Sequence, residues 1–236
     1  MSNNVKDKEL LLETFYTMSS NESLILLMEF KDDLRNYLRS IRPEVDLQLE
    51  HVQLVVDVFI AENLGNKFQL YTYMTREVVD ELLVKEKLDI TDIEILVRVI
   101  HYSVNGDTMN KLFTKLEEAT KGLEEQERDN FLLNARLGIL IWHFKSLNPG
   151  PGYNSRPELF ADNFKEHLKE AYIVCDKYGY KGYKALFLVR EGMIYKDTTK
   201  MKDGLSTLKE IGKDDVAELL VKAIKEILLI DIKEVD

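Results

Sequence analysis

Apolar residues recur every three or four positions along nearly the whole chain, and this period constrains the fold more than any other feature. Between Ser23 and Pro43, for example, the apolar residues at this spacing are Leu24, Leu27, Met28, Leu34, Leu38 and Ile41. Such a period is typical of a helix with one buried face. Only 4 Pro and 11 Gly interrupt 236 residues, and no alternating apolar and polar run is long enough for a strand. The sequence therefore predicts an all-α protein of about eleven helices.

Two arrangements of such helices fit the pattern, a compact bundle and a solenoid of helix pairs. The last third of the chain carries the spacing of a tetratricopeptide repeat, at Leu188, Gly192, Tyr195, Gly204 and Leu208. In this repeat, small residues let two paired helices approach closely. Glu191 departs from the pattern, because its position is usually apolar. The spacing favours a right-handed superhelical array of helix pairs, a tetratricopeptide-like α-solenoid, as a single domain over residues 1–236.

Charge and composition exclude several classes of function. The formal net charge is −10, whereas a protein that binds DNA needs Lys and Arg to displace phosphate counterions. The first 60 residues are acidic, and their helices are too long for a helix-turn-helix module. We therefore expect no direct nucleic-acid binding. Without a secretory signal or a run of about 20 apolar residues, we expect a cytoplasmic protein with no membrane contact, in which Cys175 is reduced and packed.

The sequence shows no pattern that would support catalysis or metal binding. Gly150 and Gly152 lie among prolines and follow a helix, unlike a phosphate-binding loop. The four histidines are scattered over separate predicted helices, without a partner at metal-ligand spacing, at positions 51, 101, 143 and 167. We therefore predict a protein that is not an enzyme and has no cofactor and no metal site.

Polar residues within apolar helices are the better candidates for a binding site. In a helical solenoid, such residues line the concave groove and can bond the backbone of an extended peptide. Six candidates for peptide binding fit this description: Arg98, Tyr102, Asn130, Asn134, Arg136 and Arg190. For each one, a satisfied buried polar group or an outward-pointing charge is the alternative interpretation.

The last helix is unusually apolar for the end of a solenoid, which normally has a polar outer face. Its candidate contact residues are Leu220, Ile224, Ile227 and Leu228. They predict either a homodimer interface or burial against the preceding helix pair. Left exposed on a monomer, the same patch would favour aggregation.

Several segments resemble the Rgg/MutR regulators. The segments Arg190–Tyr195, Gly204–Gly212 and Ala217–Leu220 are similar to the C-terminal end of that family. Phe131–Ala135 looks like its middle helix, and Thr91–Ile95 looks like a helix start upstream of it. The resemblance covers residues 75–230 and leaves residues 1–74 as additional N-terminal helices.

This resemblance implies a function in transcription regulation and quorum sensing, because the family couples a helix-turn-helix domain to a dimeric helical-repeat domain that binds a peptide pheromone. It implies a short peptide as ligand, with Asn134 as the best candidate for holding the peptide backbone and the other five as weaker ones. Since we find no helix-turn-helix pattern, we expect either the sensor domain of a longer regulator or a stand-alone form. The alternative function is a helical scaffold that binds a folded protein without a peptide signal.

Overall fold

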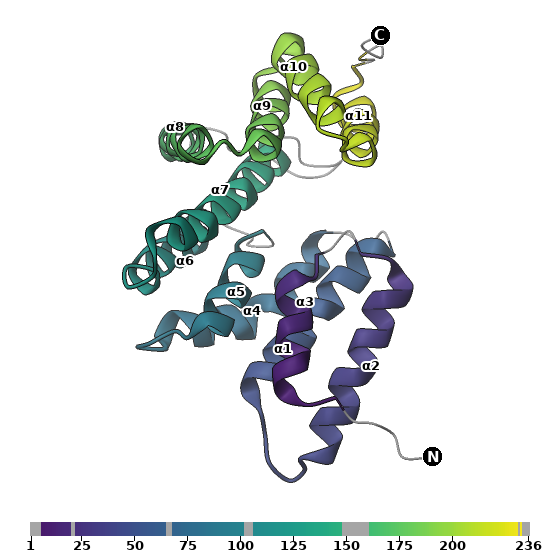
Figure 1. The fold of residues 1–236 in the computed structure, drawn as a ribbon, viewed down its shortest axis with the longest axis vertical. Helices are drawn as coiled ribbons and strands as arrows, with labels where there is room; N and C mark the ends of the chain where they lie inside the picture. Colours follow the sequence, from purple (N-terminus) through teal and green to yellow (C-terminus); the bar gives the residue numbers. More distant parts are fainter. Residues whose placement is uncertain are drawn as a thin grey trace. The chain divides into compact units, whose positions relative to one another are not determined.

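The computed structural model describes residues 6–19, 22–64, 68–101, 106–147, 161–230 and 232. These residues form eleven α-helices and no strand (Figure 1). The helices are α1 (Lys8–Thr17), α2 (Leu24–Ser40), α3 (Leu47–Asn63), α4 (Phe68–Val84), α5 (Ile90–Ile100), α6 (Gly106–Ala119), α7 (Glu125–Leu147), α8 (Ala161–Tyr178), α9 (Lys181–Tyr195), α10 (Thr198–Glu210) and α11 (Asp214–Leu228). The prediction of an all-α protein with about eleven helices is confirmed.

The chain divides into two compact units, which we name the first unit (residues 1–131) and the second unit (residues 132–236). Helix α7 begins in the first unit and ends in the second. Each unit has its own set of packed helices. A single solenoid over the whole chain stays a prediction.

Helix α3 is the centre of the first unit, where it packs against α2, α4 and α5. Its buried residues lie on every side of the helix: Leu49, His51, Val52, Val55, Val56, Val58, Phe59 and Ala61. A helix that is apolar on all sides is one that other elements surround. The composition of α3 therefore explains its central place.

Helix α9 holds the corresponding place in the second unit and lies between α8 and α10 (Figure 1). Phe187 belongs to a core cluster with buried side chains of α7 and α8. Val189 and Met193 belong to a second cluster with α10 and α11. In the first of these clusters, Cys175 is free and only 1% exposed, which confirms that the thiol is packed.

Two glycines allow α9 and α10 to pack with their backbones in contact. A Cβ at Gly192 would lie 2.8 Å from the backbone nitrogen of Met201, and a Cβ at Gly204 would lie 2.7 Å from the carbonyl oxygen of Ala185. Real Cβ atoms do not approach other atoms this closely, so only glycine fits at either position. The close helix approach predicted from the repeat spacing is confirmed for this pair.

Glu191, which departs from the repeat pattern, is buried with two polar partners. Its Oε2 accepts a hydrogen bond from the Tyr172 hydroxyl at 2.7 Å, and its Oε1 accepts one from Lys200 Nζ. A buried carboxylate is tolerated when it is paired and hydrogen-bonded in this way. The three residues link α8, α9 and α10 where the repeat pattern has an apolar contact.

Candidate functional site

The six candidate binding residues do not form one group. Arg98 and Asn130 belong to the first unit, and Asn134, Arg136 and Arg190 belong to the second. Tyr102 lies outside the described residues.

Arg98 connects α5 to the end of α1. Its Nη2 donates to the carbonyl oxygens of Phe15 and Tyr16 at 3.1 and 3.2 Å, and to that of Met18 at 3.3 Å. The guanidinium also lies 4.4 Å from the centre of the Phe15 ring and pairs with Glu94. The last carbonyls of a helix have no partner within the helix. Arg98 therefore caps α1, and a role in peptide binding stays a prediction that these contacts do not support.

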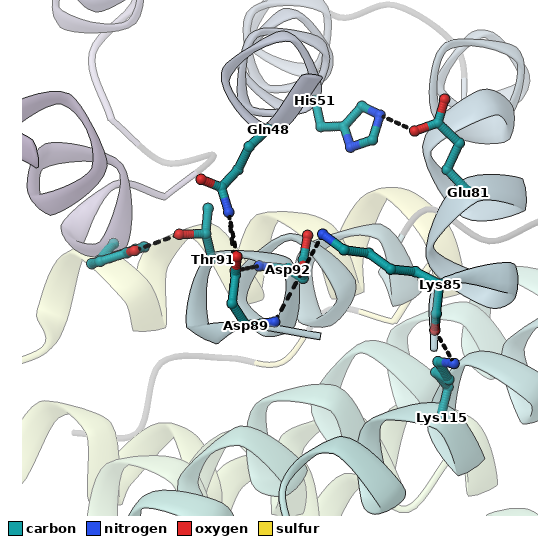
Figure 2. Close-up of polar contacts among 9 residues, drawn as sticks. Gln48, His51, Glu81, Lys85, Asp89, Thr91, Asp92 and Lys115 are labelled. Atoms are coloured by element: carbon teal, nitrogen blue, oxygen red, sulfur yellow. Dashed lines mark hydrogen bonds and ion pairs between the residues drawn. The ribbon is translucent and has the colours of Figure 1, made fainter. Parts of the chain in front are cut away.

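A polar network surrounds the start of α5 in the first unit (Figure 2). Asp89 accepts a hydrogen bond from the Asp92 backbone N–H at 3.0 Å, and Asp92 accepts one from the Asp89 N–H at 3.0 Å. Gln48 of α3 donates to Asp89 at 2.8 Å, and Lys85, the residue after α4, donates to Asp92 at 2.7 Å. This reciprocal arrangement is a capping box, and it also joins three helices. Its carboxylates are occupied by these contacts, so the network is structural.

Two further contacts in the same view join other helices of the first unit (Figure 2). The hydroxyls of Tyr16 and Thr91 lie 2.6 Å apart, which ties α1 to α5. His51 Nε2 lies 2.9 Å from the Glu81 carboxylate, which ties α3 to α4. These pairs hold the helices of the first unit together.

Asn134 contacts α9 in the second unit. Its Oδ1 accepts a hydrogen bond from the Tyr183 hydroxyl at 2.7 Å. Tyr183 is seven residues before Arg190, so both side chains project from the same face of α9, about 10 Å apart along the helix. Tyr183 was not among the predicted site residues, and its seven-residue spacing from Arg190 is the signal that could have identified it.

Arg190 is a half-buried cation that has no counter-charge among the described residues. Its Nη1 lies 3.7 Å from Met193 Sδ, and none of the described carboxylates pairs with its guanidinium. A thioether sulfur is only a weak acceptor. Burial lowers the pKa of Arg190 to about 10, which reflects the cost of placing a positive charge among apolar atoms. A ligand carboxylate paired with the Arg190 guanidinium would offset that cost.

Arg136 lies elsewhere in the second unit, near a histidine of α8. It is 8% exposed. Burial lowers the pKa of His167 to about 4, and the positive charge of Arg136 acts in the same direction. His143 stacks on the Phe164 ring with 4.5 Å between ring centres, and burial lowers the pKa of His143 as well. These basic side chains are parts of the core, and peptide binding by Arg136 stays a prediction.

The four candidate dimer residues of α11 have different environments. Leu220 is 5% exposed and Ile224 is fully buried, both in the core cluster with α9 and α10. Leu228 packs partly against the same cluster. Ile227 is 47% exposed, and Leu219, about two turns earlier on the helix, is 59% exposed. Burial against the preceding helix pair therefore accounts for most of the apolar character of α11, and the homodimer stays a prediction.

Among the described residues, no group of three or more His, Cys, Asp or Glu side chains is placed to hold a metal ion. Within the same part of the chain, no helix combines the length and apolarity needed to cross a bilayer.

Comparison with protein-family models, with curated proteins and with solved structures gives no match. The resemblance to the Rgg/MutR regulators therefore depends on the sequence segments quoted above. The geometry of the second unit provides a separate argument about function.

Proposed function

We propose that the second unit binds a short peptide on the face of α9 that carries Tyr183 and Arg190, beside Asn134 of α7. In this proposal, the chain is the sensing part of a cytoplasmic, homodimeric transcription regulator of the Rgg/MutR type. The uncompensated charge of Arg190 is the observation that carries the proposal. A second support is the resemblance of the segments Arg190–Tyr195 and Phe131–Ala135 to the Rgg/MutR regulators.

A peptide suits this face for two physical reasons. An arginine forms two parallel, charge-assisted hydrogen bonds with a carboxylate, and this geometry is stronger in a site with little water. Asn134 and Tyr183 provide an amide and a hydroxyl, which are the groups that bond peptide backbone. A peptide of about six to eight residues held by such anchors reaches micromolar affinity, about −8 kcal/mol.

The first experiment is native mass spectrometry of the protein purified from the cytoplasm of its host. A bound mass that fragments as a short peptide supports the proposal and identifies the ligand. The synthetic peptide is then titrated against the wild type and Arg190→Met by calorimetry. We expect the affinity of Arg190→Met to fall at least about tenfold, whereas its free energy of unfolding stays equal or rises by about 1–3 kcal/mol, because an unpaired buried charge is removed.

A second pair of variants separates binding from packing. Asn134→Ala is expected to weaken peptide binding with an almost unchanged melting curve, and Tyr183→Phe removes only the hydroxyl that bonds Asn134. Equal losses of stability and affinity in Asn134→Ala would show that Asn134 is structural. A protein that carries no peptide, and binds none of the host's secreted peptides, contradicts the proposal.

Exposed apolar side chains at the C-terminal end favour the second candidate function, a scaffold for a folded protein. Leu219, Ile227 and Leu229 are 59%, 47% and 86% exposed. A scaffold of this kind binds no small ligand, and its partner is lost on Leu219→Asp or Ile227→Asp. Arg190→Met leaves that binding unchanged.

A further inference from the structure

A groove of about 650 Å³ lies on another part of the second unit, lined by residues of α8, α9 and α10. It shares no residue with the proposed peptide-binding face of Asn134, Tyr183 and Arg190. The groove is therefore a separate surface, and what it binds does not depend on the proposed function.

The acidic side chain on the α9 side of the groove is already neutralised. Glu191 accepts hydrogen bonds from Tyr172 and from Lys200, both of which also line the groove. Burial first, and then the bond to Glu191, raises the pKa of Tyr172, so this hydroxyl stays protonated and donates. The Glu191–Lys200 pair adds no net charge to the groove.

The other two carboxylates of the groove are also occupied. Asp197 caps α10, where its Oδ1 accepts the backbone N–H groups of Thr199 at 3.0 Å and Lys200 at 3.2 Å. Asp176 accepts a hydrogen bond from Lys184 Nζ at 2.5 Å. The Asp197 carboxylate faces the partial positive charge of the α10 N-terminus, and the Asp176 carboxylate is paired with Lys184.

Two lysines place positive charge on the α8 side of the groove. Lys165 and Lys169 line the groove from α8 and are exposed. Neither makes a hydrogen bond or an ion pair within the part of the chain that the structure describes. They are four residues apart, so they project from the same side of α8, about 6 Å apart along its axis. The groove therefore presents two neighbouring positive charges.

Exposed apolar side chains lie beside these charges. Ile173 and Tyr195, which line the same groove, are 49% and 51% exposed. The Tyr195 ring packs against the Phe164 ring, with 6.2 Å between ring centres and 58° between their planes. An aromatic ring next to an exposed aliphatic side chain is typical of a contact that anchors a partner.

From this arrangement we propose that the groove docks an acidic amphipathic helix of a partner protein. Two carboxylates four residues apart on such a helix have the same axial spacing as Lys165 and Lys169. An apolar side chain on the adjoining face of the helix then lies against Ile173 and Tyr195. Helix-in-groove recognition combines these two elements, an apolar anchor and a matching line of charge.

A model peptide tests the proposal with the full chain. The probe is a fluorescein-labelled helical peptide of about 16 residues with Glu at two positions four apart and Leu on the adjoining face. Its binding is followed by fluorescence anisotropy at low salt. We expect the charge-reversing variant Lys165→Glu/Lys169→Glu to bind this peptide at least about tenfold more weakly than the wild type. A peptide with Lys in place of both Glu is expected to prefer the variant.

The matched control reverses two exposed lysines outside the groove, in Lys202→Glu/Lys222→Glu. This control changes the net charge equally and is expected to keep the wild-type affinity within about twofold. Ile173→Ser, which changes an exposed side chain, is expected to lower the affinity about fivefold through the apolar contact alone.

Three results would overturn the proposal. One is an equal loss of affinity in Lys165→Glu/Lys169→Glu and in the control, which indicates general attraction between charges. Another is equally tight binding of a poly-glutamate peptide without Leu, which indicates an unspecific anion patch. The third is the absence of binding by the acidic peptide at about 1 mM, the range of the weakest specific complexes.

Discussion

At the scale of single residues, the histidines of the second unit link its stability to pH. Burial, with the Arg136 charge as the second cause, lowers the pKa of His167 from 6.5 to about 4. Burial also lowers the pKa of His143. The unfolded chain therefore binds protons between pH 6.5 and pH 4 that the folded chain does not bind, so the free energy of unfolding falls as the pH falls through this range.

We expect His167 alone to remove about 2 kcal/mol of unfolding free energy between pH 7 and pH 5. Urea unfolding at both pH values, followed by the fluorescence of Trp142, measures this change, because Trp142 is the only Trp and falls in the second unit. His167→Gln is expected to lose this part of the pH dependence. The same pH dependence in the wild type and in His167→Gln would show that His167 is not buried as a neutral side chain.

Residue types in the sequence identified polar groups within apolar helices but not their partners. Arg98 was a reasonable candidate for a binding groove, yet the carbonyl groups that it caps lie 80 to 83 residues earlier, at the end of α1. Helical periodicity indicates which face of α5 carries Arg98, and it contains no information on which distant helix end meets that face. For Arg190, the apolar neighbours in sequence left open a binding residue, a satisfied buried polar group and an outward-pointing charge.

At the scale of helices, the contact between α9 and α10 depends on the absence of a side chain at two positions. We expect Gly204→Ala to lower the free energy of unfolding by about 2–3 kcal/mol, because the new Cβ would meet Val189 Cγ2 at 2.6 Å and the Ala185 carbonyl oxygen at 2.7 Å. Urea unfolding followed by Trp142 fluorescence provides the measurement.

Gly182→Ala on α9 is the matched control for this prediction. A Cβ at this position meets only Ile211 Cδ1, at 3.4 Å. Alanine also favours a helix more than glycine does, so the free energy of unfolding is expected to stay equal or rise by up to about 1 kcal/mol. Similar losses in both variants would show that glycine flexibility, and not the close helix approach, is what Gly204 provides.

Local spacing predicted the elements and this helix pair well, because a helix and its nearest partner are encoded within about 35 residues of sequence. The same spacing could not assign the apolar face of α11. Leu220 and Ile224 turn out to face the core, whereas Leu219 and Ile227 remain exposed. Both sets are apolar, and only the position of α9 and α10 determines which set is covered.

At the scale of the whole molecule, the two units are expected to unfold separately. Urea unfolding followed by circular dichroism reports helices of both units, and Trp142 fluorescence reports the second unit. We expect the two transitions not to coincide. Arg98→Met, which uncaps α1, is expected to shift only the circular dichroism transition, by about 2–3 kcal/mol, whereas Gly204→Ala shifts the fluorescence transition. Coincident transitions in the wild type and in both variants would show one cooperative unit.

The packing of Cys175 has a practical consequence for such experiments. Its thiol is 1% exposed, and burial raises its pKa to about 11, so the reactive thiolate is scarce and shielded from reagents. Because this is the only cysteine of the chain, the rate at which a thiol reagent labels the protein records how often that core opens to solvent. The labelling rate of Cys175 therefore measures transient opening of the second unit, and a ligand bound to that unit should lower this rate.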